Sequence, residues 1–479
     1  MSNIITTINN IVWSTPLIVL CLAAGAWFSI RLAFPQFRHF VTMIKLLFGG
    51  EKSTDGVTPF QAFATTVGGR VGVGNIAGVA TALYFGGPGA IFWMWVLALL
   101  GAASAFVESA LGQAYKTRVG GEYVGGPAYF IERGLGQRWY GVIFAFCTIL
   151  APGILMPGAQ TYTITSSMES AFGINQYVMA VILCVAVGLV IFGGVKRIGR
   201  VAEIIAPVMS VAFILVALVI TVMNITKVPS MIALIFKSAF GAESMFAGII
   251  GSAIAWGVKR GVYSNEAGQG SGAIVSSAAE CSHPAKQGLI QAFSIYVDTI
   301  VVCTATAFML LLTGAYNVID GAGAIISEGI PGVEYGILWA QEAVNRDLQG
   351  FGGMFIAVSV FLFAYTSLLS YYYQAESNVT YIFKENKTAK LVLRIIFICA
   401  VFYGVLNTGS MIWTCGDLGV GLMAWLNIIA ILLLSKKAVI LLKDFEEQKK
   451  RGVDPMFDPA ILGIDDKEHI WDSYKAQKK

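Results

Sequence analysis

The feature that most constrains this chain is a series of long apolar segments separated by short clusters of charged residues. A helix that crosses a bilayer needs roughly 20 apolar residues, and most of these segments reach that length. Of the 479 residues, 56% are hydrophobic and 13% are charged, against about 45–50% and about 25% in soluble domains. A soluble core cannot bury so much apolar surface, so we expect a polytopic membrane protein embedded in a lipid bilayer.

Eleven apolar segments are predicted to cross the bilayer, which makes the fold class all-α. They lie near residues 13–33, 60–86, 88–113, 139–170, 175–194, 203–224, 239–257, 287–313, 350–374, 391–409 and 416–435. With the N-terminus outside, 29 of the 32 basic residues fall on the cytoplasmic side, and the others are Lys227, Lys237 and Arg346. The positive-inside rule therefore predicts an extracytoplasmic N-terminus and a cytoplasmic C-terminus.

One N-terminal helix followed by ten spans divides into two halves of five spans with opposite topology. Inverted repeats of this kind are common in secondary transporters. We therefore expect an N-terminal helix with a cytoplasmic connector, a first inverted repeat, a second inverted repeat and a cytoplasmic tail, at residues 1–58, 59–225, 226–435 and 436–479.

Two glycine-rich segments open the expected halves at matching positions. The first is 65-TTVGGRVGVGNIAGVATALYFGG-87 and the second is 239-AFGAESMFAGIIGSAIAWGVKRG-261. Each interior glycine costs a continuous helix about 1 kcal/mol relative to alanine, so such clusters favour places where the backbone unwinds. Close helix packing through small residues is the alternative for either segment alone. We expect both helices to be broken and to bind substrate and ions there.

Other classes of protein find little support in the sequence. The seven cysteines form no CxxC pair, so neither a disulfide framework nor a transition-metal site is expected. A membrane enzyme would need clustered His, Glu or Cys at membrane depth, and an ion channel, the alternative from another class, would need a repeated filter or an Arg ladder. No nucleotide-binding GxxxxGK[ST] motif occurs. We expect no enzyme activity, no nucleic-acid partner and no obligatory protein partner.

The segment 86-GGPGAIFWMWVLALLG-101 resembles the signature of the alanine or glycine:cation symporter family, because of its FWMW core. The resemblance continues through 72-GVGNIAG-78, 122-EYVGGPAYFI-131 and 257-GVKRGVYSNEAGQGS-271, and covers residues 10 to 440. It implies sodium-coupled, occasionally proton-coupled, uptake of alanine or glycine across a prokaryotic plasma membrane. It also implies a LeuT-like core of ten helices with one extra helix.

The first glycine-rich segment contains the strongest candidates for substrate binding. Free N–H groups at the start of a half-helix can bind the carboxylate of an amino acid, and unwound carbonyls can coordinate sodium. We expect Gly72, Val73, Gly74 and Asn75 to do this, with the Asn75 side chain facing sodium or the carboxylate. The alternative is a helix-packing stripe in which Asn75 makes an interhelical hydrogen bond.

The fourth span and the second glycine-rich segment add further candidates. In 150-LAPGILMPGAQTYTIT-165 two prolines and two glycines break the helix beside Gln160 and Thr161. Gln160 can accept a hydrogen bond from the substrate ammonium, or it can satisfy backbone carbonyls freed by the prolines. Ser252 can complete coordination and Trp256 can wall the pocket, although an aromatic side chain on an apolar face more often only packs. One methyl group is worth only about 1–3 kcal/mol, so the sequence leaves glycine and alanine undistinguished.

Sodium, with a proton as the alternative, is the expected coupling ion. In LeuT-like symporters a Thr/Ser pair meets carbonyls of the first broken helix, so the resemblance places a sodium site at Thr366 and Ser367. On the broken helix, Gly69, Gly72 and Asn75 are the candidate ligands of this sodium ion. The alternative is local, since membrane Ser and Thr commonly bond the carbonyl four residues back.

Charges at membrane depth are functional candidates by default. Asp298 can neutralise a cation or carry a proton. The alternative is a structural role, in which its carboxylate bonds to Thr299 or to an amide of a neighbouring helix. Four other charged residues lie nearer the inner ends of spans: Arg70, Glu108, Glu203 and Glu266. We expect them to form stabilising ion pairs at helix ends, and a charge-paired intracellular gate that involves Arg70 is the alternative.

Overall fold

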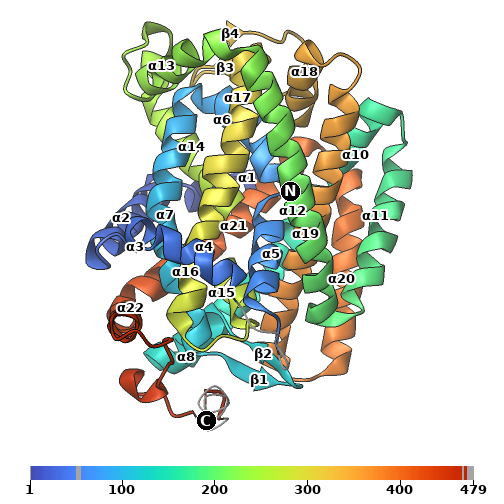
Figure 1. Cartoon of the computed structure of the whole chain (residues 1–479). Coiled ribbons are helices and arrows are strands. Elements are labelled where there is room, and N and C mark those ends of the chain that lie inside the picture. The colour runs from blue at the N-terminus through green and yellow to red at the C-terminus, as the bar shows by residue number, and fades with distance from the viewer. Residues whose placement is uncertain (1, 50–55, 467–468, 472–479) are drawn as a thin grey trace.

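The computed structural model describes residues 2–49, 56–466 and 469–471. Parts of the expected connector (50–55) and tail (467–468 and 472–479) lie outside the described residues. The long helices run roughly along one axis, with one β-hairpin at each end of the molecule (Figure 1). The core is formed where these helices pack on one another.

The elements have the following bounds. The α-helices are α1 (Ser2–Val12), α2 (Thr15–Arg31), α3 (Pro35–Arg38), α4 (Phe40–Phe48), α5 (Pro59–Arg70), α6 (Val79–Gly86), α7 (Gly89–Ala114), α8 (Pro127–Leu135), α9 (Arg138–Leu150), α10 (Pro157–Phe172), α11 (Gln176–Ile191), α12 (Gly194–Met223), α13 (Val228–Ala239), α14 (Ile250–Asn265), α15 (Ser271–Ser277), α16 (Pro284–Ile295), α17 (Thr304–Thr313), α18 (Ile337–Asp347), α19 (Gly352–Phe383), α20 (Lys387–Tyr403), α21 (Gly409–Leu433) and α22 (Ser435–Lys450). The π-helices are η1 (Gly74–Gly78), η2 (Ala151–Leu155) and η5 (Tyr296–Cys303), and the 3₁₀-helices are η3 (Ile225–Lys227), η4 (Ser244–Ile249), η6 (Gly404–Leu406) and η7 (Pro459–Leu462). Two antiparallel hairpins pair β1 (Thr117–Val119) with β2 (Glu122–Val124) and β3 (Asn317–Ile319) with β4 (Ile325–Glu328).

The described chain has 8 helices that are long and apolar enough to cross a membrane. A helix pair bent by 44° raises this to 9 when it is counted as one span. The eight are Ile4–Arg31, Gly89–Ala114, Arg138–Phe172, Gly194–Met223, Pro284–Thr313, Gly352–Phe383, Lys387–Leu406 and Gly409–Leu433, and the pair is Ile225–Ala239 with Ser244–Asn265. Of the other expected spans, 175–194 corresponds to the shorter helix α11 and 60–86 is divided among α5, η1 and α6. The protein is therefore a mostly helical, multi-pass membrane protein.

The first glycine-rich segment is broken, as predicted. Helix α5 begins with a capping box in which Thr58 and Gln61 exchange two hydrogen bonds of 3.1 Å. It ends at Arg70, and Val71 has an extended backbone with ψ of 93°. The chain resumes as the π-helix η1 and then as α6. The fourth span is also interrupted as expected, by η2 between α9 and α10.

The second glycine-rich segment is broken near its start and continuous after it. The helix pair Ile225–Ala239 and Ser244–Asn265 is bent by 44° at a break that contains Gly241, whose φ is 69°. Helix α14 then runs without a break from Ile250 to Asn265, so the expected break does not extend through 250–261. Within α14, Gly257 and Gly261 serve packing, because a Cβ on Gly257 would lie 2.6 Å from the Ala90 carbonyl and one on Gly261 would lie 2.6 Å from the Leu97 side chain, both on α7. The chain bends before η4 and leaves the helix again at Glu266, whose φ is 55°. Small residues at a helix contact explain the glycines here.

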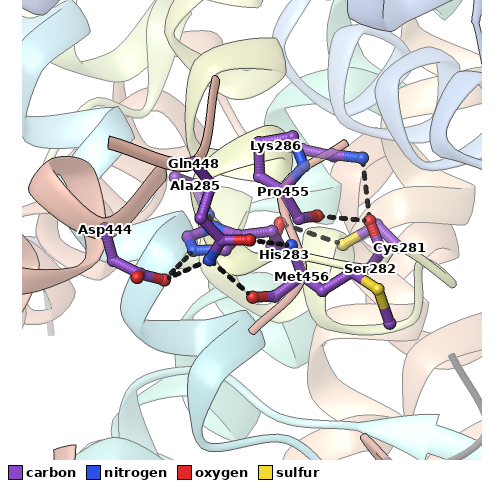
Figure 2. Close-up of polar contacts among 9 residues, drawn as sticks. All are labelled: Cys281, Ser282, His283, Ala285, Lys286, Asp444, Gln448, Pro455 and Met456. Atoms are coloured by element: carbon purple, nitrogen blue, oxygen red, sulfur yellow. Dashed lines mark hydrogen bonds and ion pairs between the residues drawn. The ribbon is translucent and has the colours of Figure 1, made fainter. Parts of the chain in front are cut away.

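The segment after the last span is anchored to the end of the bundle that carries β1 and β2 (Figure 1). His283 accepts a hydrogen bond from the Ala285 N–H through Nδ1 and contacts Asp444 of α22 through Nε2, both at 3.0 Å (Figure 2). Lys286 forms an ion pair of 2.5 Å with Asp454. Burial lowers the pKa of His283, and the hydrogen bond with Asp444 opposes this shift. The neutral ring therefore fits this anchor, because protonation of Nδ1 would remove its bond to the backbone.

The contact between α14 and α7 predicts the effect of adding a methyl group to each of two glycines. Gly257→Ala should lower the stability of the purified protein by about 1–3 kcal/mol, because the new Cβ would clash with backbone and with Trp93. Gly251→Ala, on the same helix with nothing within 4 Å of its Cβ, is the matched control and should have little effect. Thermal unfolding in detergent measures both, and equal midpoints would refute the packing role of Gly257.

Candidate functional site

The break between α5 and η1 leaves backbone N–H groups that side chains now satisfy. The Gly72 N–H donates to Asn75 Oδ1 at 2.9 Å, and the Val73 N–H donates to Gln160 Oε1 at 3.3 Å. Gln160 in turn donates from Nε2 to the Tyr371 hydroxyl at 3.2 Å. All of these groups are buried. The break is therefore a dry polar site in which neutral amides take the place of water.

Glycines bring the surrounding helices close to this break. A Cβ on Gly72 would clash with Ser367 Oγ and would lie 3.2 Å from Gln160 Oε1. A Cβ on Gly69 would lie 2.5 Å from Ser370 Oγ, and one on Gly74 would lie 3.1 Å from the Tyr263 ring. The predicted residues Gly69, Gly72 and Gly74 thus permit direct approach of α19 and α14 to the broken backbone.

The predicted hydroxyl pair on α19 faces the end of α5. Thr366 Oγ1 and Ser367 Oγ lie 3.1 and 3.0 Å from the Gly68 carbonyl oxygen. They also lie 2.8 and 3.1 Å from the Phe363 carbonyl oxygen of their own helix. Each hydroxyl has one hydrogen, so the Gly68 and Phe363 carbonyls are two acceptors for the same donor, and the local acceptor that the sequence offered as an alternative is within reach together with the long-range one. Two hydroxyl oxygens and a carbonyl oxygen thus converge, and hard cations favour oxygen ligands.

Asp298 lies on η5, fully buried, and receives hydrogen bonds from three neutral side chains. Asn75 Nδ2 donates at 2.7 Å, Ser264 Oγ at 2.9 Å and Thr299 Oγ1 at 2.7 Å. The expected amide and Thr299 partners are both present, and Ser264 was missed because it falls in a segment that looked like a polar connector. Asn75 joins this carboxylate to the Gly72 N–H, so Asp298 and the broken backbone form one polar network.

Three predicted substrate residues lie apart from this network. Thr161 donates to the Pro157 carbonyl of its own helix at 3.2 Å and packs against Gly404. Ser252 donates to the Phe85 carbonyl at 2.6 Å at the end of α6. Trp256 stacks on the Phe85 ring with centroids 4.3 Å apart. The structure therefore places Ser252 and Trp256 against α6, beyond the break.

A buried ion cluster joins α14 to α21 beside the break. Asp417 Oδ2 lies 2.5 Å from Arg260 Nη2 and 2.8 Å from Lys259 Nζ. The Arg260 side chain reaches Gly78 of η1, where a Cβ would lie 3.7 Å from Arg260 Cδ. The expected span ended at residue 257 and left Lys259 and Arg260 in the segment after it, whereas α14 continues through both to Asn265. The charged residues at 259, 260 and 417, which lie in or next to apolar segments, were the sequence feature that could have indicated this cluster.

The helix-end ion pairs expected for Arg70 and Glu203 also differ in the structure. Arg70 donates to Ser294 and to the Gln291 carbonyl, and among the described residues no carboxylate bonds to it. Glu203 accepts a hydrogen bond of 3.0 Å from Gln61 Nε2. Arg70 is 2% exposed, so it lies inside the protein and not at the mouth of a span.

Comparison with known proteins gives this geometry a context. The model of the sodium:alanine symporter family matches residues 1–459. The chain belongs to the sodium:alanine symporter family. A putative sodium/proton-dependent alanine carrier protein of Bacillus subtilis, YrbD, is 52% identical over 97% of this chain and 96% of its own length. A sodium/proton-dependent alanine carrier protein of Bacillus sp. (strain PS3) is 48% identical over 90% of this chain and 98% of its own length.

Solved structures agree with the fold of this sodium:alanine symporter family member. The crystal structure of MhsT in complex with L-phenylalanine superposes with a TM-score of 0.52 at 14% identity, over 82% of this chain and 99% of that chain. Such low identity supports the fold alone, which is LeuT-like. The family is a transporter family, in keeping with the expectation that this chain is not an enzyme.

The ion cluster predicts a large stability effect in this family member. Asp417→Asn should lower stability by about 3–5 kcal/mol, because Arg260 and Lys259 would lose their anionic partner in a buried place. Glu447→Gln is the control, since Glu447 is exposed and lies 4.0 Å from Arg451, where a pair is worth about 0–1 kcal/mol. Chemical unfolding in detergent compares the two, and similar losses would contradict the assignment.

Proposed function

We propose that this protein is a secondary active symporter that imports a small neutral amino acid, alanine and/or glycine, together with sodium. The observation that carries the proposal is the broken backbone at 71–74, faced by the hydroxyl pair on α19, in a member of the sodium:alanine symporter family. The named relatives are alanine carriers, which supports alanine as substrate. Import follows the sodium gradient, by rocking of one helix bundle against the other.

The proposed architecture has eleven transmembrane helices: one N-terminal helix and two inverted repeats of five, at 59–225 and 226–435. The eight long spans and the bent pair supply nine of them, and α11 and the broken helix α5–η1–α6 supply the others. The N-terminus is extracytoplasmic and the tail is cytoplasmic, in the plasma membrane of a prokaryote. The distribution of basic residues supports this orientation.

The substrate carboxylate is proposed to bind the N–H groups of Val73 and Gly74. Gln160 Oε1 now accepts from Val73, so a carboxylate can replace it at the positive end of the following half-helix. The released Gln160 carbonyl oxygen then accepts from the substrate ammonium. Thr161, Ser252 and Trp256 are proposed to lie around the outer wall of the site.

Sodium is proposed to bind between the hydroxyls of Thr366 and Ser367 and carbonyls of the broken helix, near Gly69 and Gly72. Each hydroxyl hydrogen would then be donated to the Phe363 carbonyl of α19 and not to the Gly68 carbonyl, so that the oxygens face the ion. Asp298 is proposed to supply negative charge for a second cation beside Asn75. A proton is the alternative coupling ion, and the names of both relatives include it.

Substrate binding is tested by Asn75→Ala and Gln160→Ala. Gln160→Ala removes the proposed hydrogen bond to the substrate ammonium, and Asn75→Ala removes the bond that holds the Gly72 N–H beside the carboxylate site together with the bond to the charged Asp298. A hydrogen bond to a charged group contributes about 1.5–3 kcal/mol, so alanine affinity should fall about tenfold or more. Gln176→Ala, a partly exposed side chain that donates to Glu169, is the control. Labelled alanine uptake into proteoliposomes measures the change, and unchanged kinetics in both variants would remove these residues from the site.

Sodium binding is tested on α19 with Thr366→Val and Ser367→Ala. Each removes one oxygen ligand, so the sodium concentration for half-maximal alanine uptake should rise about tenfold. Ser359→Ala is the matched control, because Ser359 lies on the same helix and its hydroxyl donates to the Phe355 carbonyl of that helix at 2.7 Å. Uptake that ignores sodium but follows pH would replace sodium with a proton as the coupling ion.

A further inference from the structure

A second buried polar cluster lies next to the break, where α5 ends, beside the residue that follows α14. It contains Arg70 from α5, Glu108 from α7 and Glu266 from the end of α14. These three side chains are 2%, 0% and 1% exposed. The cluster is joined to the proposed site by short stretches of chain, since Arg70 precedes Gly72 and Glu266 follows Ser264.

Negative charge exceeds positive charge in this part of the protein. Among the described residues, Glu266 interacts electrostatically with five ionisable groups. They are Arg70, Glu108, Tyr263, Asp298 and Tyr371. The Arg70 guanidinium thus interacts electrostatically with three buried carboxyl groups, those of Glu108, Glu266 and Asp298. Buried charges are costly unless they are paired, so the ionised cluster lacks compensating positive charge.

Two carboxylate oxygens of the cluster are open to a proton. Within the described residues, Glu108 Oε1 and Glu266 Oε1 have no hydrogen-bond donor. Arg70 uses Nη1 for Ser294 and Gln291, and among these residues its Nε and Nη2 have no acceptor, so the guanidinium does not bond to either oxygen. Arg70 Nη2 and Glu108 Oε1 both face Gly272, at 2.5 and 3.4 Å from where its Cβ would lie. A metal ion there would meet the guanidinium, whereas a proton adds to a single carboxylate oxygen.

The two glutamates differ in how well their anions are stabilised. Glu108 Oε2 accepts from the Gly270 N–H at 3.1 Å and from Asn427 Nδ2 at 2.8 Å. Glu266 accepts only from Ser271 Oγ, at 2.5 Å, within the described residues. Hydrogen bonds to a carboxylate favour its charged form, so hydrogen bonds stabilise the Glu266 anion less than the Glu108 anion.

We propose that Glu266 is a proton-binding residue of the transport cycle, with Arg70 and Glu108 as positioning residues. The proton comes from water, forms an O–H bond on one Glu266 oxygen, and leaves to water with the bond electrons remaining on that oxygen. This rests on the proposed function, and it adds a proton to the sodium that binds at the break.

The segment 264–266 connects the proton site to the ion site. Ser264 donates to Asp298, and Asn265 Nδ2 donates to Thr299 Oγ1, which itself donates to Asp298. A change of charge at Glu266 also acts electrostatically on the Asp298 carboxylate. Proton binding at Glu266 and cation binding at Asp298 therefore influence one another, as linkage requires.

The experiment uses the full chain in proteoliposomes that hold a pH-sensitive dye, with an inward sodium gradient and labelled alanine. The wild type should acidify the interior as alanine enters. Glu266→Gln should still take up alanine but lose this acidification, because the amide cannot be deprotonated. Glu376→Gln is the matched control, since Glu376 is 9% exposed and pairs with Arg394 at 3.6 Å, and it should keep both signals.

The outcomes separate the two proposals. A wild type that takes up no alanine refutes the proposed function. A wild type that takes up alanine without acidification, or a Glu266→Gln variant that acidifies as the wild type does, overturns the proton site alone. If Glu266→Gln does not fold, Glu266→Asp should keep the acidification and shift the pH midpoint of uptake, and an unshifted midpoint overturns the proposal.

Discussion

The structure depends on the break in the first glycine-rich helix, where backbone groups lie unpaired by helical bonds inside a membrane. Unsatisfied amides at that depth cost several kcal/mol each, so the surrounding helices must supply partners. Gln160 does so from α10 and the hydroxyls of Thr366 and Ser367 from α19, while Asn75 of the broken segment itself accepts from the Gly72 N–H. The need to satisfy one broken segment therefore determines which helices pack around it and where their polar side chains lie.

Glycine has two roles in this arrangement, and the two halves of the chain separate them. In the first half, Val71 is extended and Gly72 and Gly74 allow α19 and α14 to approach the open backbone. In the second half, Gly257 and Gly261 lie within a continuous helix and accommodate α7. The same composition thus produces an opened backbone in one place and a close helix contact in the other. The difference lies in what each segment contacts. Polar side chains surround the first segment, whereas the backbone of α7 and the Leu97 side chain face the second.

The sequence predicted the parts of this fold that depend on composition and local pattern. The membrane class, the break at Gly72–Asn75 and the facing of Thr366 and Ser367 toward α5 follow from apolar length, glycine clustering and the family resemblance. The sequence could not predict that α14 continues through Arg260, because its polar residues resemble a loop until Asp417, 157 residues later, is known to pair with them. Ser264 and Tyr371 were missed for a similar reason. Hydroxyls in apolar helices are common, and only the packing of distant helices makes these two part of a site.

Asn75 gives the site a physical basis for coupling. Its Oδ1 holds the Gly72 N–H while its Nδ2 donates to Asp298, so one amide is shared by the proposed substrate backbone and the proposed ion site. A cation at Asp298 would compete with Nδ2 for the carboxylate, and any movement of Asn75 would change the hydrogen bond at Gly72. Binding at either place therefore changes the free energy of binding at the other by the same amount, which is the thermodynamic requirement for symport. Two independent pockets would bind both species but would give no such reciprocity.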